Sequence, residues 1–134
     1  MKSLRRKGSS TYRKYLRSPG WHARRATWFE ANAENDGKVP CVVCRSRLSV
    51  HTLQLHHVDY RGVVELAGGR WASRERDDDL MPFCADCHEQ LHTLFDGNPG
   101  WKALGRRAAT TRAVGKMQRR LARYLAATLA REGL

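Results

Sequence analysis

Long hydrophobic runs are absent from this 134-residue sequence, in which hydrophobic residues make up 41% of the chain. No segment is long and apolar enough to cross a bilayer, which argues against a membrane protein. The basic N-terminus is not followed by the apolar stretch of a secretory signal, so we expect the protein to reside in the cytoplasm. The length and the modest hydrophobic content predict one small domain with a thin core, which a bound metal ion would reinforce.

Acidic residues are also scarce, because 13 Asp and Glu face 25 Lys and Arg, for a formal net charge of +12. The surplus lies at the two ends: residues 1–40 carry +7, residues 41–100 carry −3 and residues 101–134 carry +8. Two basic flanks around a mildly acidic centre favour a polyanion that the flanks hold while cations bind in the middle. The alternative is a protein that simply carries excess Lys and Arg on its surface.

Cysteine is rare but regularly placed, since the four cysteines form two C-x-x-C pairs, Cys41 with Cys44 and Cys84 with Cys87. In a reducing compartment, pairs at this spacing are more often metal ligands than disulfides. Two such pairs supply the four thiolates of the closed tetrahedral site that is typical of structural zinc. A redox motif is the alternative, but nothing resembles the βαβ context of such motifs.

Four of the six histidines lie in the same part of the chain. His56 and His57 are adjacent on a predicted strand, where neighbouring side chains point to opposite faces, so they should not chelate one ion together. His88 and His92 lie four residues apart on a predicted helix and therefore share a face. The alternative is that all four are incidental or sit beside the zinc.

From Val39 to His92 the order is a Cys pair, a His pair, Asp79, a second Cys pair and two further histidines. This stretch resembles the HNH endonuclease family, also called ββα-metal or His-Me finger, in its zinc-stapled CxxC…CxxC form. A weaker similarity covers residues 15–36. The resemblance implies a metal-dependent endonuclease that hydrolyses DNA phosphodiester bonds, by nicking or by double-strand cleavage. Because the family occurs in phages, restriction systems, mobile elements and packaging machinery, it also implies a bacterial cell or a phage-infected host.

The resemblance assigns a role to each site residue. His56, His88 and His92 would bind the catalytic ion, and His57 would be the general base that activates water. Asp79 occupies the position of a family asparagine that orients this base, although an ionised carboxylate cannot donate a hydrogen bond as asparagine does. Asp79 therefore orients an imidazole, approaches the metal, or marks a weakened enzyme. The ion would be Mg²⁺ or Mn²⁺, with Ni²⁺ and Zn²⁺ as alternatives for a His-rich site.

The patterning predicts a small α+β protein, in which a ββα-metal finger unit with a Cys₄ zinc is flanked by basic helices. We expect a basic N-terminal arm over residues 1–17 and a core with its own N-terminal helix over residues 18–100. A basic amphipathic helix over residues 101–134 would then pack on the core, on a second subunit or on an assembly partner. Within the core, Ser18-Pro19 begins a helix and Gly68-Gly69 turns a small hairpin.

The predicted DNA contacts are five arginines, two on the first core helix and three in the insertion between the strands: Arg24, Arg25, Arg70, Arg74 and Arg76. The aromatic residues on the same helix are expected in the core rather than stacked on bases. A plain surface loop is the alternative for the insertion.

Two rival functions stay open at this point. One is a non-catalytic zinc module that binds DNA or a protein, in which Asp79 marks lost activity. The other is a nuclease subunit that is active only within a larger assembly. The sequence does not choose DNA over RNA, a cleavage preference, the catalytic metal or an oligomeric state.

Overall fold

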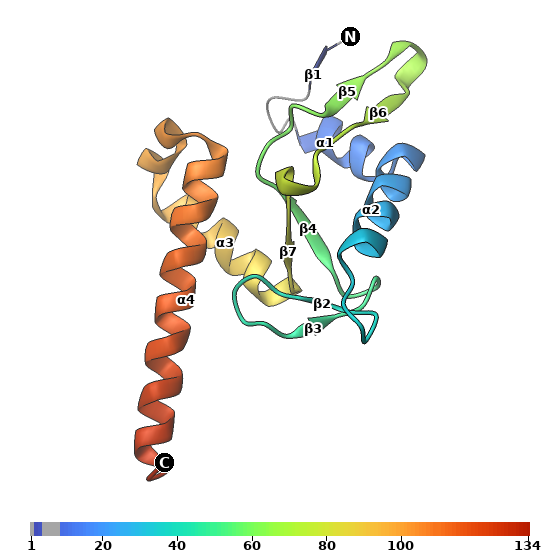
Figure 1. Cartoon of the computed structure of the whole chain (residues 1–134). Coiled ribbons are helices and arrows are strands. Elements are labelled where there is room, and N and C mark those ends of the chain that lie inside the picture. Colours follow the sequence, from blue (N-terminus) through green and yellow to red (C-terminus); the bar gives the residue numbers. More distant parts are fainter. Residues whose placement is uncertain (1, 4–8) are drawn as a thin grey trace.

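Two strands, β4 (Gln54–His57) and β7 (Leu80–Phe83), form an antiparallel pair at the centre of the computed structural model, which describes residues 2–3 and 9–134 (Figure 1). The register pairs Gln54 with Phe83 and His57 with Leu80. Helix α3 (Ala85–Gly97) begins directly after β7 and contacts both strands. The last three residues of β4 are all buried, so both faces of this strand are covered.

The helix predicted to begin at Ser18-Pro19 is α2 (Pro19–Asn32). Ser18 Oγ accepts a hydrogen bond of 3.2 Å from the backbone N–H of Trp21, and Pro19 fits the first turn because its missing N–H is not needed there. The tryptophans of this helix, Trp21 and Trp28, are 5% and 3% exposed and belong to the core, as predicted.

The predicted N-terminal arm contains helix α1 (Ser9–Leu16), which packs on α2. At the start of the chain, β1 (Lys2–Ser3) pairs with β5 (Val63–Glu65). Residue 1 and residues 4–8 of the arm lie outside the described residues. The arm therefore includes regular structure at two places.

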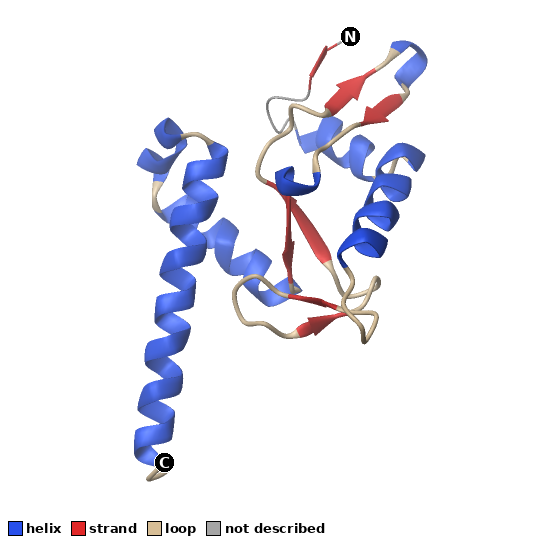
Figure 2. Cartoon of the chain, viewed as in Figure 1, coloured by secondary structure: helices blue, strands red, loops and turns tan. Residues whose placement is uncertain are grey.

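The predicted hairpin is formed by β5 and β6 (Trp71–Ser73), joined by a 3₁₀ turn over Ala67–Gly69. Gly68 and Gly69 have φ of 75° and 72°, a left-handed conformation that glycine adopts without a steric penalty. With β1 the hairpin makes a three-stranded antiparallel sheet (Figure 2).

A second small sheet pairs β2 (Val39–Pro40) with β3 (Arg47–Leu48), and the turn between them carries the first cysteine pair. The backbone N–H of Val42 donates a 2.9 Å hydrogen bond to the carbonyl of Pro82 in β7. This bond fixes the turn beside the point where β7 leads into α3.

Helix α4 (Arg106–Arg131) follows a 3₁₀ segment over Pro99–Leu104 and packs on α3 with its first half. The buried residues of that half are Ala109, Thr110, Ala113, Val114 and Met117. Beyond them the helix extends away from the rest of the fold, and Tyr124 and Leu125 are 63% and 50% exposed (Figure 1). Only the first half of α4 therefore packs on the core, which was one of the partners expected for this helix.

The architecture is mixed α+β, with helices around small antiparallel sheets, which confirms the predicted class at that level. No described helix is long and apolar enough to cross a membrane.

Candidate metal centres

The four cysteines converge into one cluster, although the two pairs lie about 40 residues apart. Cys41 and Cys44 come from the β2–β3 turn, whereas Cys84 and Cys87 come from the start of α3. All four sulfur atoms lie within 4.8 Å of one another. None of the four forms a disulfide.

The local backbone positions these thiols for a tetrahedral ion. Cys84 caps α3, and its sulfur accepts a 3.4 Å hydrogen bond from the backbone N–H of Cys87. The sulfurs of Cys44 and Cys84 lie 3.8 Å apart, which matches the roughly 3.8 Å between two thiolates on one tetrahedral zinc ion with Zn–S bonds of about 2.3 Å. The donor set therefore fits a metal such as zinc.

The thiols differ in how readily they ionise. Burial raises the pKa of Cys41 and of Cys87. Burial also opposes ionisation of Cys44, but hydrogen bonds from Ser46 and from the neighbouring thiols outweigh it and lower the pKa of Cys44 to about 7. A bound cation would lower the raised pKa of Cys41 and of Cys87, because a coordinating thiol is deprotonated.

Three imidazoles form a second cluster between β4 and α3. His56 lies on β4, and His88 and His92 lie one helical turn apart on α3. Each offers a ring nitrogen, and these nitrogens lie within 4.8 Å of one another. His56 is 1% exposed, whereas the two helical histidines are half-buried. The three rings could hold one divalent ion, with its remaining positions open toward solvent.

Two polar side chains orient this cluster, and neither was predicted from the sequence. Gln54 Oε1 lies 2.7 Å from His88 Nδ1, and Thr110 Oγ1 of α4 lies 3.0 Å from His56 Nε2. Burial, followed by the positive charge of Arg106, lowers the pKa of His56. His56 is therefore neutral, which is the form that a metal requires. Such outer partners fix ring orientation around metal sites.

His57 points to the opposite face of β4 and is fully buried. Its Nε2 lies 2.7 Å from Glu75 Oε2, an oxygen that also accepts a hydrogen bond from the hydroxyl of Tyr15. The ring of Tyr60 stacks on the imidazole with a centroid distance of 4.8 Å, and the ring of Trp21 lies at the same distance. His57 Nδ1 has no hydrogen-bond partner among the described residues.

Glu75 is a further site residue that sequence reasoning missed. It is 3% exposed, although it stands between two exposed arginines in the polar insertion. Burial opposes its ionisation, but the hydrogen bonds from His57 and Tyr15 outweigh this and lower the pKa of Glu75. The imidazole is therefore paired with a carboxylate. The only sequence signal was an acidic residue within an arginine-rich stretch.

Asp79 contacts arginines and not an imidazole, whose orientation was one of the three roles left open for it. Its carboxylate accepts hydrogen bonds of 2.9 Å and 2.8 Å from Arg61 and a further one from Arg107. Its backbone carbonyl accepts a 2.9 Å bond from the N–H of Val58. Among the described residues, no hydrogen bond joins Asp79 to His57. Asp79 thus connects the segment after β4 to α4, and it is Glu75 that contacts the imidazole of His57.

The five arginines predicted to contact DNA differ in their surroundings. Arg24 donates to the carbonyl of Glu75 and pairs with Asp77, and Arg25 donates to the carbonyl of Leu53. Burial lowers the pKa of Arg25. The three arginines of the insertion are exposed: Arg70, Arg74 and Arg76. The first two therefore serve the fold, whatever else they contact.

Comparison of the chain with protein-family models, with curated proteins and with solved structures finds no match. What the two clusters can do must therefore follow from their own donor atoms, burial and charge.

Proposed function

We propose that the protein is a metal-dependent endonuclease that hydrolyses DNA phosphodiester bonds, with a divalent ion held by His56, His88 and His92. The observation that carries the proposal is the convergence of these three rings, within 4.8 Å, from a strand pair and the helix that follows it. This order of two antiparallel strands and one helix is the arrangement expected of a ββα-metal unit. The Cys₄ cluster at the start of the same helix would be its structural zinc site.

The donor set suits a hydrolytic site. Three protein ligands leave positions open on the ion, which distinguishes catalytic from structural metal centres. When bound, the ion would neutralise charge that develops on the scissile phosphate and on the leaving 3′-oxygen. His56 is held neutral by its burial, and Gln54 and Thr110 keep two of the rings oriented.

His57 remains the proposed general base, and Glu75 is its proposed positioning residue. A carboxylate that accepts from Nε2–H fixes the tautomer in which Nδ1 carries the lone pair. That nitrogen has no hydrogen-bond partner among the described residues, so it is the one available to accept a proton from water. Asp79, in place of the family asparagine, would hold the loop after β4 through Arg61 and Arg107.

A second candidate is a non-catalytic zinc module that binds DNA or a protein. The observation that favours it is the complete burial of His57 against Tyr60 and Trp21, because a general base must reach water. A nuclease subunit that acts only inside a larger assembly is a variant of the first candidate, since an assembly partner would expose the base.

Plasmid nicking by zinc-loaded protein with added Mg²⁺ or Mn²⁺ tests the proposal. We expect wild type to nick, His57→Ala and His88→Ala each to lose at least a hundredfold in rate, and His51→Ala to nick like wild type. His51 is the matched control because it is an exposed histidine outside both clusters. If wild type binds DNA but does not nick it, the zinc-module candidate replaces the nuclease. Full activity of His88→Ala would also contradict the proposal.

A further inference from the structure

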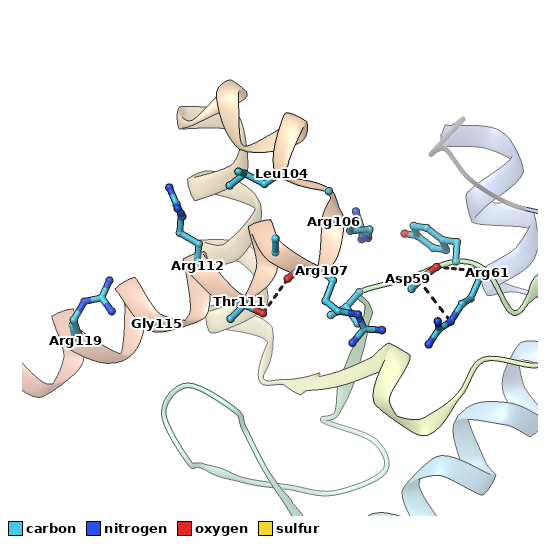
Figure 3. Close-up of a pocket in the computed structure, with 13 residues that line it drawn as sticks. Asp59, Arg61, Leu104, Arg106, Arg107, Thr111, Arg112, Gly115 and Arg119 are labelled. Carbon is cyan, nitrogen blue, oxygen red and sulfur yellow. Dashed lines mark hydrogen bonds and ion pairs between the residues drawn. The ribbon is translucent and has the colours of Figure 1, made fainter.

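An open groove of about 1220 Å³ lies outside both clusters, between the segment after β4 and the first half of α4 (Figure 3). Five arginines line it: Arg61, Arg106, Arg107, Arg112 and Arg119. The only acidic residue of the lining is Asp59, which lies 3.8 Å from Arg61. The groove is therefore strongly positive.

The fold neutralises only part of this charge. Arg61 and Arg107 share the buried carboxylate of Asp79, and both are about half exposed. Arg106 donates to the backbone carbonyl of His57, and its guanidinium lies 4.7 Å from the centre of the Tyr60 ring. These contacts hold three guanidinium groups in fixed places, Arg61 on the segment after β4 and Arg106 and Arg107 at the start of α4.

Arg112 and Arg119 lie further along the same wall, on α4, and they are exposed and make no hydrogen bond or ion pair within the described parts of the chain. They stand seven residues apart, or roughly 10 Å along the helix axis, and share a helix face with Gly115. A Cβ at Gly115 would come 3.2 Å from Arg119 Nη1, so the guanidinium lies across the glycine. Figure 3 shows both arginines projecting from the helix.

We propose that this groove binds the sugar–phosphate backbone of a nucleic acid. All of its basic residues are arginines, whose planar fork matches a phosphate better than the point charge of a lysine does. Two of the guanidinium groups face solvent with no intramolecular anion, which leaves them for a ligand that carries repeated negative charges. The inference rests on the proposed function for the identity of the substrate and deepens it by naming the surface that holds it.

The groove adjoins the histidine cluster through α4. Thr110 lies in the same stretch of the helix as the lining residues Arg107 and Thr111, and its hydroxyl is 3.0 Å from His56 Nε2. Arg106 donates to the residue that follows His56. A backbone bound in the groove would therefore run along the edge of the cluster, where a scissile phosphate has to lie.

The test is fluorescence anisotropy with a short labelled DNA duplex and zinc-loaded protein, without added Mg²⁺ or Mn²⁺, and with the duplex checked afterwards on a gel. Arg112→Glu/Arg119→Glu is compared with Arg123→Glu/Arg131→Glu. The control pair changes the net charge equally on the same helix but lies outside the groove. We expect at least a tenfold loss of affinity for the groove variant and less than threefold for the control. The dependence of log K on log salt should become shallower by about two for the groove variant.

Three results of the binding measurements would overturn the inference. Equal losses in the two variants would mean that only the overall charge matters. A loss confined to Arg70→Glu/Arg74→Glu would place the backbone on the β5–β6 side. Competition by poly-glutamate as effective as that by unlabelled duplex would indicate an acidic protein partner. Binding that depends on the groove without nicking would refute the proposed function alone, whereas nicking that survives the groove substitutions would refute the groove alone.

Discussion

The cysteine cluster and the histidine cluster are built from the same helix but differ in what surrounds them. Two of the four thiols are buried, and the cluster joins a turn and a helix start that lie far apart in the sequence. The histidine cluster has one buried ring and two half-buried rings, with Gln54 and Thr110 as polar partners. The difference lies in the donor atoms and in their surroundings: four sulfur atoms from two distant segments in one cluster, and three imidazoles with polar partners in the other.

The largest expected effect comes from breaking the cysteine cluster with Cys87→Ser. Structural zinc contributes roughly 10–16 kcal/mol of binding free energy in small zinc domains, and this energy supports folding. We expect the variant to lose its zinc and its cooperative melting transition in scanning calorimetry. A zinc chelator should do the same to wild type. A variant that melts within a few degrees of wild type would show that the cluster is not structural.

The next largest effect is expected at the buried pair of His57 and Glu75. Glu75→Gln keeps the shape of the side chain but removes the negative charge of the carboxylate. That carboxylate pairs with His57 and accepts a hydrogen bond from Tyr15. We expect a loss of about 2 kcal/mol in the free energy of unfolding, measured with urea. Glu65→Gln, on an exposed position of β5, should change it by less than about 0.5 kcal/mol. Equal small effects would mean that the pair does not hold His57.

Asp79→Asn should destabilise the protein by about 1–3 kcal/mol at neutral pH, because it removes a carboxylate shared by Arg61 and Arg107. Burial opposes ionisation of Asp79, but these arginines outweigh it and hold its pKa below the ordinary value of 3.8. A depressed pKa stabilises the folded state above the unfolded pKa and ceases to do so as the pH falls through the folded one. The difference in the free energy of unfolding between wild type and variant should therefore be constant down to about pH 5 and shrink below about pH 4. A difference that does not change with pH would contradict the ion-pair account.

The smallest effect is expected from His92→Ala, measured without added divalent ion beyond one zinc per chain. The ring is half-buried and lies beside a second imidazole, so its loss should change the free energy of unfolding by less than about 1 kcal/mol. Cooperative unfolding should be retained, unlike that of Cys87→Ser. Unfolding of His92→Ala at room temperature would remove the distinction between the two clusters.

Regular spacing predicted the local parts of this molecule. The C-x-x-C pairs, the cap at Ser18 and the glycine turn at Gly68-Gly69 are short-range signals, and each is present in the structure. The spacing of His88 and His92 likewise places both rings beside His56.

The remaining features depend on contacts between distant segments, which no local pattern encodes. Glu75 reaches His57 across 18 positions, and Arg107 reaches Asp79 across 28. The groove exists because α4 lies beside the segment after β4, which helical periodicity alone does not reveal. The ion pair of Arg24, which was predicted to contact DNA, joins it to Asp77 across 53 positions.

The most direct measurement is the number of ions bound per chain when metal-free protein is titrated with Co²⁺, combined with the absorption spectrum of the cobalt-bound form. The account predicts two ions per chain for wild type and one for His88→Ala/His92→Ala, with thiolate-to-cobalt absorption unchanged between them. A single ion in wild type, or two ions in the double variant, would contradict the claim that sulfur and imidazole hold separate metals in this protein.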